Sequence, residues 1–281
     1  RLSLVGSEMC IRDSENCVNA GIFVFEKKIC DYVPEPVKRN LENDVIKGML
    51  EAGEPIYGYC SPEYVKDVGT VERVNQTLAD IERGVIAGKC LKNKQRCIFM
   101  DRDGTINQYK GLVYKGEDFT LEDCAVDAIR KINQSGRLGI VITNQPVVAR
   151  GLCEIEDVEN IHKKMETLLG KEGVFLDDVF YCPHHPDKGY PEENPAYKTP
   201  CECRKPKTGM IQKAAERYNI DLAGSWMIGD TTMDIQTGIN AGMRTALVQT
   251  GEAGNDKKYD VKPDLVCRDL LDAVEKILQV D

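Results

Sequence analysis

The sequence predicts an α/β protein whose larger part is a parallel β-sheet flanked by helices. Short apolar runs typical of buried strands recur from residue 97 to residue 266. Segments with helical periodicity, each of about ten residues, separate these runs, and strands that alternate with such helices form βαβ units. Several of the runs end in polar side chains, and ligands of open α/β sheets bind at the carboxyl ends of the strands. A ligand site is therefore expected at that edge.

Composition limits the classes of function. The chain has 281 residues, of which 42% are hydrophobic and 30% charged, as expected for one large or two smaller domains with a true core. The net charge of −9 argues against a nucleic-acid-binding surface. No apolar stretch approaches the roughly 18–20 residues that cross a bilayer, so we expect no membrane partner. Most of the 12 cysteines lie singly in apolar runs, which favours a reducing cytoplasm.

The N-terminal part resembles a fragment of another enzyme family. Residues 1–14 resemble a translated sequencing adapter, and we exclude them from the fold as an artefact. In residues 15–89 we expect a turn and strand (19–25), a helix (43–50), a strand (55–60) and, after Asp67-Val-Gly-Thr70, a helix (71–84). This order is similar to the C-terminal part of sugar-phosphate nucleotidyltransferases. The resemblance implies a partial α/β module without nucleotidyltransferase activity, because the family's Gly-rich phosphate loop has no counterpart.

A basic linker at residues 90–95 leads into a second module at residues 96–281. Its predicted strands are 97–100, 138–144, 178–182, 225–230, 244–249 and 265–266. Its predicted helices are 125–134, 155–169, 210–218, 233–241 and 269–278.

Three of these strands end in side chains suited to one reaction. Asp101 and Asp103 follow the first strand, Thr143 and Asn144 end the second, and Asp230 ends the fourth; a loop adds Lys205. Each element alone has an ordinary structural explanation, such as a polar turn, a helix cap or a solvated lysine. Their combination indicates phosphoryl transfer through a covalent carboxyl intermediate.

Each group has an expected part in that chemistry. A carboxylate that attacks phosphorus needs a divalent cation beside it, because the two anions repel each other. Asp101, Asp103 and Asp230 offer hard oxygen ligands to Mg²⁺, one of them through a backbone oxygen. Thr143 and Lys205 can stabilise the transferring phosphoryl group, and Asp103 is placed to protonate the leaving alkoxide and then to deprotonate water.

The set Asp101-Arg-Asp-Gly-Thr, Ile142-Thr-Asn, Lys205-Pro and Gly229-Asp-x-x-x-Asp resembles the four motifs of the haloacid dehalogenase (HAD) superfamily of phosphatases. The resemblance implies a Rossmann-like fold in which Asp101 is the nucleophile, Asp103 the general acid and base, and Asp234 a supporting residue. The short distance along the chain between Thr105 and Thr143 leads us to expect no separate cap domain.

A cysteine and histidine cluster lies in the loop at residues 182–203. Three thiolates and one imidazole match a closed tetrahedral zinc site, and a chance group of reduced cysteines or a disulfide from Cys182 are the alternatives. The expected ligands are Cys182, His184, Cys201 and Cys203.

Within the superfamily, this cluster resembles that of D,D-heptose 1,7-bisphosphate 7-phosphatases and the related histidinol-phosphate phosphatases. The stretch from Thr143 to Gly151 favours the heptose branch, although Pro146 replaces the usual serine. The resemblance implies a sugar phosphate substrate, with histidinol phosphate as the rival and a non-enzymatic zinc-stabilised module as an alternative of another class. It also implies substrate contacts by Tyr109, Lys110, Gly111, Leu112, Asn144, Gln145, Arg150 and Arg204.

Overall fold

The computed structural model describes residues 20–33, 38–58, 61, 63–187, 189 and 192–280. Contacts within the chain divide it into two compact units. The first comprises residues up to 61 together with 65–67, and the second comprises residues 62–64 and 68–281. The adapter-like residues 1–14 and the expected turn at Asn19 lie outside the described residues.

The first unit is helical where it is described. A 3-10 helix spans Lys27–Tyr32, and a π-helical stretch, Leu41–Ile46, continues into α1 (Lys47–Glu51), which confirms the expected helix at 43–50. The strands expected at 19–25 and 55–60 are wrong for the described residues of those segments, which form no strand. The physical reason is the lack of a partner: Val24 is 97% exposed and Tyr57 is 87% exposed, so neither segment buries a face against a sheet.

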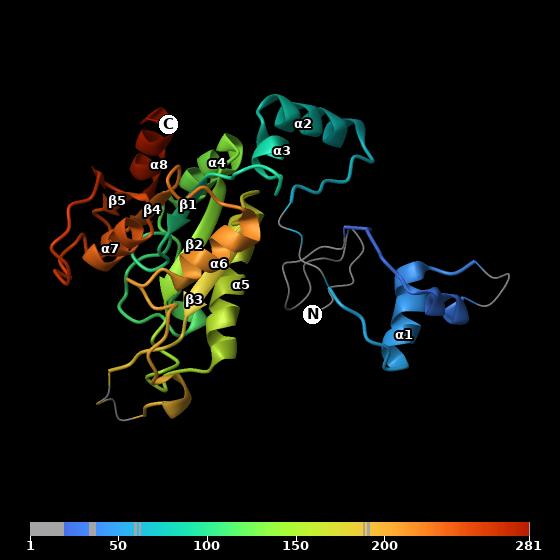
Figure 1. Ribbon diagram of the computed structural model, residues 1–281, viewed down its shortest axis with the longest axis horizontal. Coiled ribbons are helices and arrows are strands. Elements are labelled where there is room, and N and C mark those ends of the chain that lie inside the picture. Colours follow the sequence, from blue (N-terminus) through green and yellow to red (C-terminus); the bar gives the residue numbers. More distant parts are fainter. Residues whose placement is uncertain are drawn as a thin grey trace. The chain divides into compact units, whose positions relative to one another are not determined.

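The second unit is built on a parallel six-stranded sheet with the strand order β3-β2-β1-β4-β5-β6 (Figure 1). This is the doubly wound order, in which a crevice forms where the connections reverse direction on either side of β1. The register places Met100 of β1 beside Val141 of β2 and Ile228 of β4. The strands are β1 (Cys97–Met100), β2 (Leu138–Asn144), β3 (Asp178–Cys182), β4 (Trp226–Gly229), β5 (Arg244–Val248) and β6 (Leu265–Cys267).

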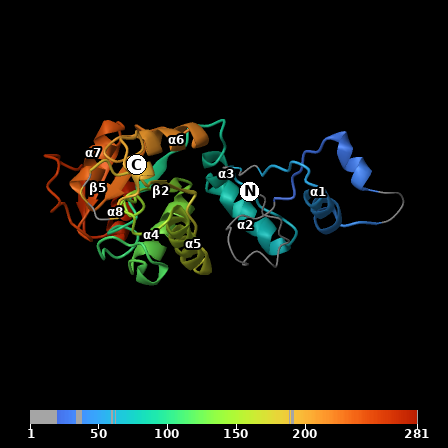
Figure 2. The same ribbon diagram turned by 90° about the horizontal axis from the view of Figure 1, so that it is seen from below.

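Helices cover both faces of the sheet, and Figure 2 shows them on opposite sides. Alternate residues of β1 explain this arrangement: Ile98 and Met100 belong to one apolar cluster and Cys97 and Phe99 to the other. The first cluster contains residues of α4 (Ala125–Ser135), α5 (Ile155–Lys171) and α8 (Leu270–Val280). The second contains residues of α6 (Gly209–Tyr218), and α7 (Thr232–Asn240) packs beside β4. The expected helices and strands of this module are thus confirmed.

The second unit also includes α2 (Val71–Glu82) and α3 (Val85–Gly88), which the sequence places in the first module. Thr70 caps α2 by accepting a hydrogen bond from the Arg73 amide at 3.3 Å. After α3, the buried Lys89 ammonium lies 2.5 Å from the Asp177 carboxylate, next to the start of β3. The boundary between the two compact units therefore lies between residues 61 and 68, ahead of the linker predicted at residues 90–95.

Between β1 and β2 the chain forms a loop, a 3-10 helix at Gly116–Asp118 and α4, and nothing larger. This leaves the carboxyl end of β1 without a cap domain from that segment. Among the described residues, no helix is both long and apolar enough to cross a membrane.

Candidate active site

Three carboxylates meet at the carboxyl ends of β1 and β4. Asp101 follows β1, and its amide donates to the Ile228 carbonyl of β4 at 2.9 Å, which holds the two strand ends together. Asp230 follows β4, and Asp234 lies in the first turn of α7. One carboxylate oxygen of each of these three residues lies within 4.8 Å of the others. The predicted pair of Asp101 and Asp230 is therefore joined by Asp234, which the sequence suggested only as a supporting residue.

Glycines make room for the Asp230 carboxylate. Gly104 has a φ of +76°, and a Cβ atom there would collide with the Asp230 side chain. A Cβ atom on Gly251, whose φ is +61°, would collide with the same carboxylate. Both positions need glycine for the turn as well as for the space. The chain after Asp103 can therefore curl over Asp230.

Lys205 connects two of the carboxylates. Its ammonium lies 2.9 Å from Asp101 and 2.5 Å from Asp234, and its side chain is only 2% exposed. Asn144, at the end of β2, holds the lysine in place: its side-chain oxygen accepts from the Lys205 amide at 3.0 Å, and its amide nitrogen donates to the Lys205 carbonyl at 3.3 Å. The end of β2 thus positions the lysine loop against the end of β1.

The carboxylates carry more negative charge than the protein neutralises. Burial, then Asp234 and Asp101, raise the pKa of Asp230 to about 8. Burial and Asp234 likewise raise the pKa of Asp101 to about 6, although Lys205 acts in the opposite direction. Burial disfavours the charge of Lys205, but Asp101 and Asp234 outweigh it and raise the pKa of the lysine.

This site fits a divalent cation. The Asp230 Oδ1 atom is buried and accepts no hydrogen bond from any described residue, whereas Oδ2 accepts from the Glu252 amide at 2.7 Å. A buried carboxylate oxygen without a partner is costly unless something positive occupies the space beside it. Carboxylate oxygens are the ligands that Mg²⁺ prefers. The donor set at Asp101 and Asp230 therefore suits that ion.

Asp103 lies beside this group, and its carboxylate is surrounded by donors. The Nη2 atom of Arg102 donates to both carboxylate oxygens, at 3.0 Å to Oδ1 and 2.9 Å to Oδ2. Asn107 donates to Oδ1 at 3.0 Å, and Gln145 donates to Oδ2 at 2.9 Å. The Asp103 side chain remains 20% exposed, so a substrate can reach it. These contacts fix the carboxylate in one orientation.

Thr143 is linked to Asp103 through Gln145. The Gln145 amide nitrogen donates to Thr143 Oγ1 at 3.0 Å as well as to Asp103. Thr143 and Gln145 are 1% and 2% exposed. Because the threonine oxygen accepts this bond, its O–H remains available to donate toward the site.

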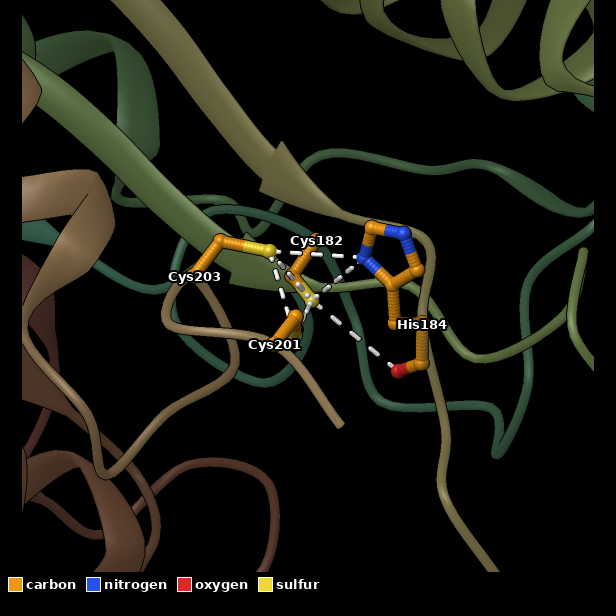
Figure 3. Close-up of side chains that lie close together, drawn as sticks. All are labelled: Cys182, His184, Cys201 and Cys203. Atoms are coloured by element: carbon orange, nitrogen blue, oxygen red, sulfur yellow. Dashed lines mark hydrogen bonds between the residues drawn. The ribbon is translucent and has the colours of Figure 1, made fainter. Parts of the chain in front are cut away.

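The four predicted zinc ligands converge at the end of β3 (Figure 3). The Cys203 sulfur lies 3.0 Å from that of Cys182 and 3.3 Å from that of Cys201, and the Cys182 and Cys201 sulfurs are 3.5 Å apart. His184 Nδ1 lies 3.4 Å from the Cys203 sulfur and 3.7 Å from the Cys182 sulfur. Zinc–sulfur bonds of about 2.3 Å in a tetrahedron place sulfurs roughly 3.8 Å apart, so this donor set fits zinc after small shifts.

Apart from Asn144 and Gln145, which contact Lys205 and Asp103, the predicted substrate residues lie in the loop after β1 and at two arginines, Arg150 and Arg204. In the loop after β1, Tyr109 and Leu112 are 46% and 38% exposed, and Gly111 has a φ of +74°. Lys110 donates within its own loop, to the Asp118 carbonyl at 3.2 Å and to Thr120 at 2.9 Å. Arg204 donates to the His184 carbonyl at 3.1 Å, beside the zinc cluster.

Arg150 is close enough to Arg204 for its charge to act on that guanidinium. Burial is the main cause that lowers the pKa of Arg204, and the positive charge of Arg150 contributes. An arginine suits the recognition of an anion such as phosphate, because its guanidinium can donate two parallel hydrogen bonds.

Sequence reasoning missed two contributors to the site. The buried Arg102 holds Asp103, and Arg102 in turn meets His162 of α5 at 3.2 Å. Glu252 donates from its amide to Asp230, and its carboxylate accepts from the Tyr109 hydroxyl at 2.8 Å. The contacts of Arg102 with His162 and of Glu252 with Asp230 and Tyr109 leave no local pattern, because they join residues that are far apart in the chain.

Comparisons with known proteins indicate the family of this chain. A HAD-hydrolase-like family model matches residues 202–273. The chain is 37% identical to the D-glycero-β-D-manno-heptose-1,7-bisphosphate 7-phosphatase of Haemophilus ducreyi over 182 residues, which cover 64% of this chain and 97% of that protein. It is 40% identical to the enzyme of that name from Escherichia coli K12 over 156 residues, covering 55% of this chain and 80% of that protein.

A solved structure is similar as well. The D,D-heptose 1,7-bisphosphate phosphatase from B. bronchiseptica, crystallised with magnesium and phosphate, matches with a TM-score of 0.58 and 34% identity, over 66% of this chain and all of that one. A HAD-like phosphatase from Mesorhizobium loti matches with a TM-score of 0.55 and 30% identity, over 66% of this chain and 88% of that one. The chain therefore belongs to the HAD-like phosphatase family that includes the heptose 1,7-bisphosphate 7-phosphatases, and it is a phosphoric monoester hydrolase.

Proposed function

We propose that this protein is a Mg²⁺-dependent phosphatase that removes the 7-phosphate of D-glycero-β-D-manno-heptose 1,7-bisphosphate in the cytoplasm, in the synthesis of activated heptose for lipopolysaccharide. The names of the relatives at 37–40% identity support the substrate. The strongest structural support is the position of Asp101, which Lys205 holds at 2.9 Å beside Asp230 at the edge of the sheet.

The reaction proceeds in two displacements. In the first, a carboxylate oxygen of Asp101 attacks phosphorus, the bond from phosphorus to the sugar oxygen breaks, and Asp103 gives its proton to the departing alkoxide. In the second, Asp103 takes a proton from water and the water oxygen attacks phosphorus. The bond between phosphorus and Asp101 breaks, which releases inorganic phosphate and restores the Asp101 carboxylate.

Other residues of the chain support these steps. Thr143 donates its hydroxyl proton to a phosphoryl oxygen, because its own oxygen already accepts from Gln145. Lys205 offsets the charge of Asp101 and Asp234. Asp101, Asp230 and a backbone oxygen of Asp103 would hold Mg²⁺, which reduces the repulsion between the nucleophile and the phosphate when it is bound.

Two further groups recognise and order the site. Arg150 and Arg204 offer a positive site for the second phosphate of a bisphosphate, with Tyr109, Lys110, Gly111, Leu112, Asn144 and Gln145 lining the approach to the sugar. Cys182, His184, Cys201 and Cys203 would hold a structural zinc ion that keeps Arg204 in position, because Arg204 donates to the His184 carbonyl. Thiolate ligands require reduced cysteines, which a reducing cytoplasm provides.

A comparison of two substrates tests the proposal. Purified protein with Mg²⁺ should release phosphate from the heptose 1,7-bisphosphate with a higher kcat/KM than from histidinol phosphate, which lacks the second phosphate for the two arginines. The Arg150→Met variant should reduce the difference in kcat/KM between the two substrates, because it should raise KM for the bisphosphate and leave KM for histidinol phosphate unchanged. A higher kcat/KM for histidinol phosphate would overturn the proposed substrate and leave the phosphatase activity itself untouched.

A further inference from the structure

A buried arginine and a buried histidine adjoin the proposed general acid without a part in the chemistry described above. The Arg102 side chain is fully buried, whereas most arginines of folded proteins are exposed. Its Nε and Nη2 atoms donate to the Asp103 carboxylate at 3.2, 3.0 and 2.9 Å. The guanidinium therefore donates to both oxygens of that carboxylate, and these hydrogen bonds fix the orientation of its plane.

The remaining nitrogen of the guanidinium meets a second buried side chain. Nη1 lies 3.2 Å from Nε2 of His162, which is 7% exposed. Arginine does not lose its proton at working pH, so Nη1 donates and the imidazole nitrogen accepts. Burial and the charge of Arg102 lower the pKa of His162 to about 3, so the ring is neutral and able to accept at any pH near 7.

The histidine is itself held firmly. It belongs to α5, whose Ile161 and Met165 are buried in the main apolar cluster. Its ring packs edge-to-face on Tyr181 of β3, with ring centroids 5.2 Å apart. The position of the acceptor nitrogen is thus set by a helix and a strand, both distant along the chain from the loop that carries Asp103.

We infer that His162 is a positioning residue for catalysis, which orients Arg102 and through it the carboxylate of Asp103. This inference rests on the proposed part of Asp103 as general acid. Without an acceptor at His162, the buried Nη1 would lose its hydrogen-bond partner there, and the guanidinium would turn toward another one. The Asp103 carboxylate would turn with it, although Asn107 and Gln145 would still hold it in part.

A comparison of two leaving groups shows whether the general acid, Asp103, is misplaced. A sugar alkoxide is strongly basic and needs a proton as it departs, whereas p-nitrophenolate departs without one. A misdirected Asp103 therefore slows the first displacement on a sugar phosphate and spares that on p-nitrophenyl phosphate. A purely structural defect would slow both alike.

Two variants isolate the acceptor. His162→Phe retains a ring against Tyr181 and removes the acceptor, whereas His162→Gln places an amide oxygen where Nε2 lies. The measurement is the rate of leaving-group release in the first turnover, by rapid quench, for the heptose bisphosphate and for p-nitrophenyl phosphate. We expect His162→Phe to slow sugar release by about 10- to 100-fold and nitrophenol release by less than about threefold, with KM unchanged. His162→Gln should restore most of the sugar rate.

Two further variants separate the possible failures. Asp103→Asn should show the same selective loss, only larger, and Glu156→Gln, at an exposed site on α5, should show none. Equal slowing of both substrates in His162→Phe, or no slowing, would overturn the positioning role. An Asp103→Asn variant without selective loss would instead overturn the proposed acid. If the heptose bisphosphate is not turned over at all, fructose 1,6-bisphosphate serves as the alkyl phosphate in the same comparison.

Discussion

At the scale of single residues, the site is dominated by carboxylates that the folded chain does not neutralise. Asp101 and Asp230 have pKa values raised to about 6 and about 8, and Asp230 retains a buried oxygen that accepts no hydrogen bond from the described residues. Such groups destabilise the fold unless a cation accompanies them. The same imbalance that costs stability prepares the site for a metal ion and a phosphate.

The first prediction concerns the nucleophile. Asp101→Asn removes the attacking carboxylate and retains the shape of the side chain, so phosphate release should fall by at least about 10³-fold. The melting temperature should not fall, because a buried charge has been removed. Measured release of phosphate from p-nitrophenyl phosphate checks the rate independently of the sugar. Unchanged turnover would show that another residue attacks phosphorus.

The second prediction concerns pH. A carboxyl whose folded pKa is raised contributes stability that is complete below its unfolded pKa, near 3.9, and that is lost as the pH rises through the folded pKa. Protein dialysed free of magnesium should therefore melt at lower temperature as the pH rises from about 5 to about 8. Added Mg²⁺ should raise the melting temperature more at pH 8 than at pH 5. An equal effect of Mg²⁺ at both pH values in the unaltered chain, or a pH-dependent effect that persists in Asp230→Asn, would contradict the assigned site.

Single residues also show what a sequence can and cannot disclose about a site. The positions of Asp101, Thr143 and Asp230 at one edge of the sheet could be predicted. Asp101 and Asp230 follow apolar strands, Thr143 lies near the end of one, and parallel strands bring their carboxyl ends together. His162 could not be predicted, because its partner Arg102 lies 60 positions away along the chain and the histidine sits on the apolar face of a helix. At such a position a histidine gives no sign of the group it contacts.

At the scale of elements, the segment at residues 182–203 carries the proposed zinc ligands. Residues 182–203 contain a single short 3-10 helix, Pro195–Tyr197, among the described positions, and they join β3 to the loop that carries Lys205. The thiol cluster ties both ends of this segment together. Loss of a metal ion bound there should therefore displace Arg204 and Lys205, which follow Cys203 directly.

The third prediction tests this dependence. Cys201→Ser and Cys203→Ser should each abolish stoichiometric zinc in the purified protein, lower the melting temperature and raise KM for the bisphosphate. Cys153→Ser, at a cysteine outside the cluster, should change neither the zinc content nor KM. Zinc content is measured by inductively coupled plasma mass spectrometry. A native protein that contains no zinc would remove the proposed site.

The elements of the second unit could be predicted closely, whereas in the first unit the helix at 43–50 is confirmed and the expected strands are wrong for the described residues. From β1 to α8, apolar runs and helical periodicity coincide with the observed bounds within a few residues, because both faces of the sheet are buried. The strand expected at 19–25 rested on Ile22-Phe-Val-Phe25, which is apolar but mostly exposed. Apolar residues produce a strand only where neighbouring strands complete the hydrogen bonds.

At the scale of the whole molecule, the catalytic groups belong to one unit. Every contact described for the site joins residues between 97 and 267, and residues from 68 onward belong to the same compact unit. The buried ion pair of Lys89 with Asp177 joins α3 to this unit. The phosphatase should therefore begin before the predicted linker at residues 90–95.

The fourth prediction follows from that division. A chain of residues 68–281 should retain the kcat/KM and melting temperature of the full chain. A chain of residues 96–281 should melt at lower temperature, because the removal of Lys89 leaves the Asp177 charge without its partner. Equal melting temperatures for the two truncated chains would contradict the contribution of α3.

The most direct test of the central claim is to observe which phosphate leaves. Phosphorus-31 NMR of heptose 1,7-bisphosphate, incubated with the purified protein and Mg²⁺, distinguishes the primary phosphate ester at C7 from the phosphate at C1. We predict loss of the C7 signal, a matching rise of inorganic phosphate and an unchanged signal from the 1-phosphate, all absent with Asp101→Asn. Loss of the C1 signal first, or no change in either signal while p-nitrophenyl phosphate is hydrolysed, would contradict the proposed function.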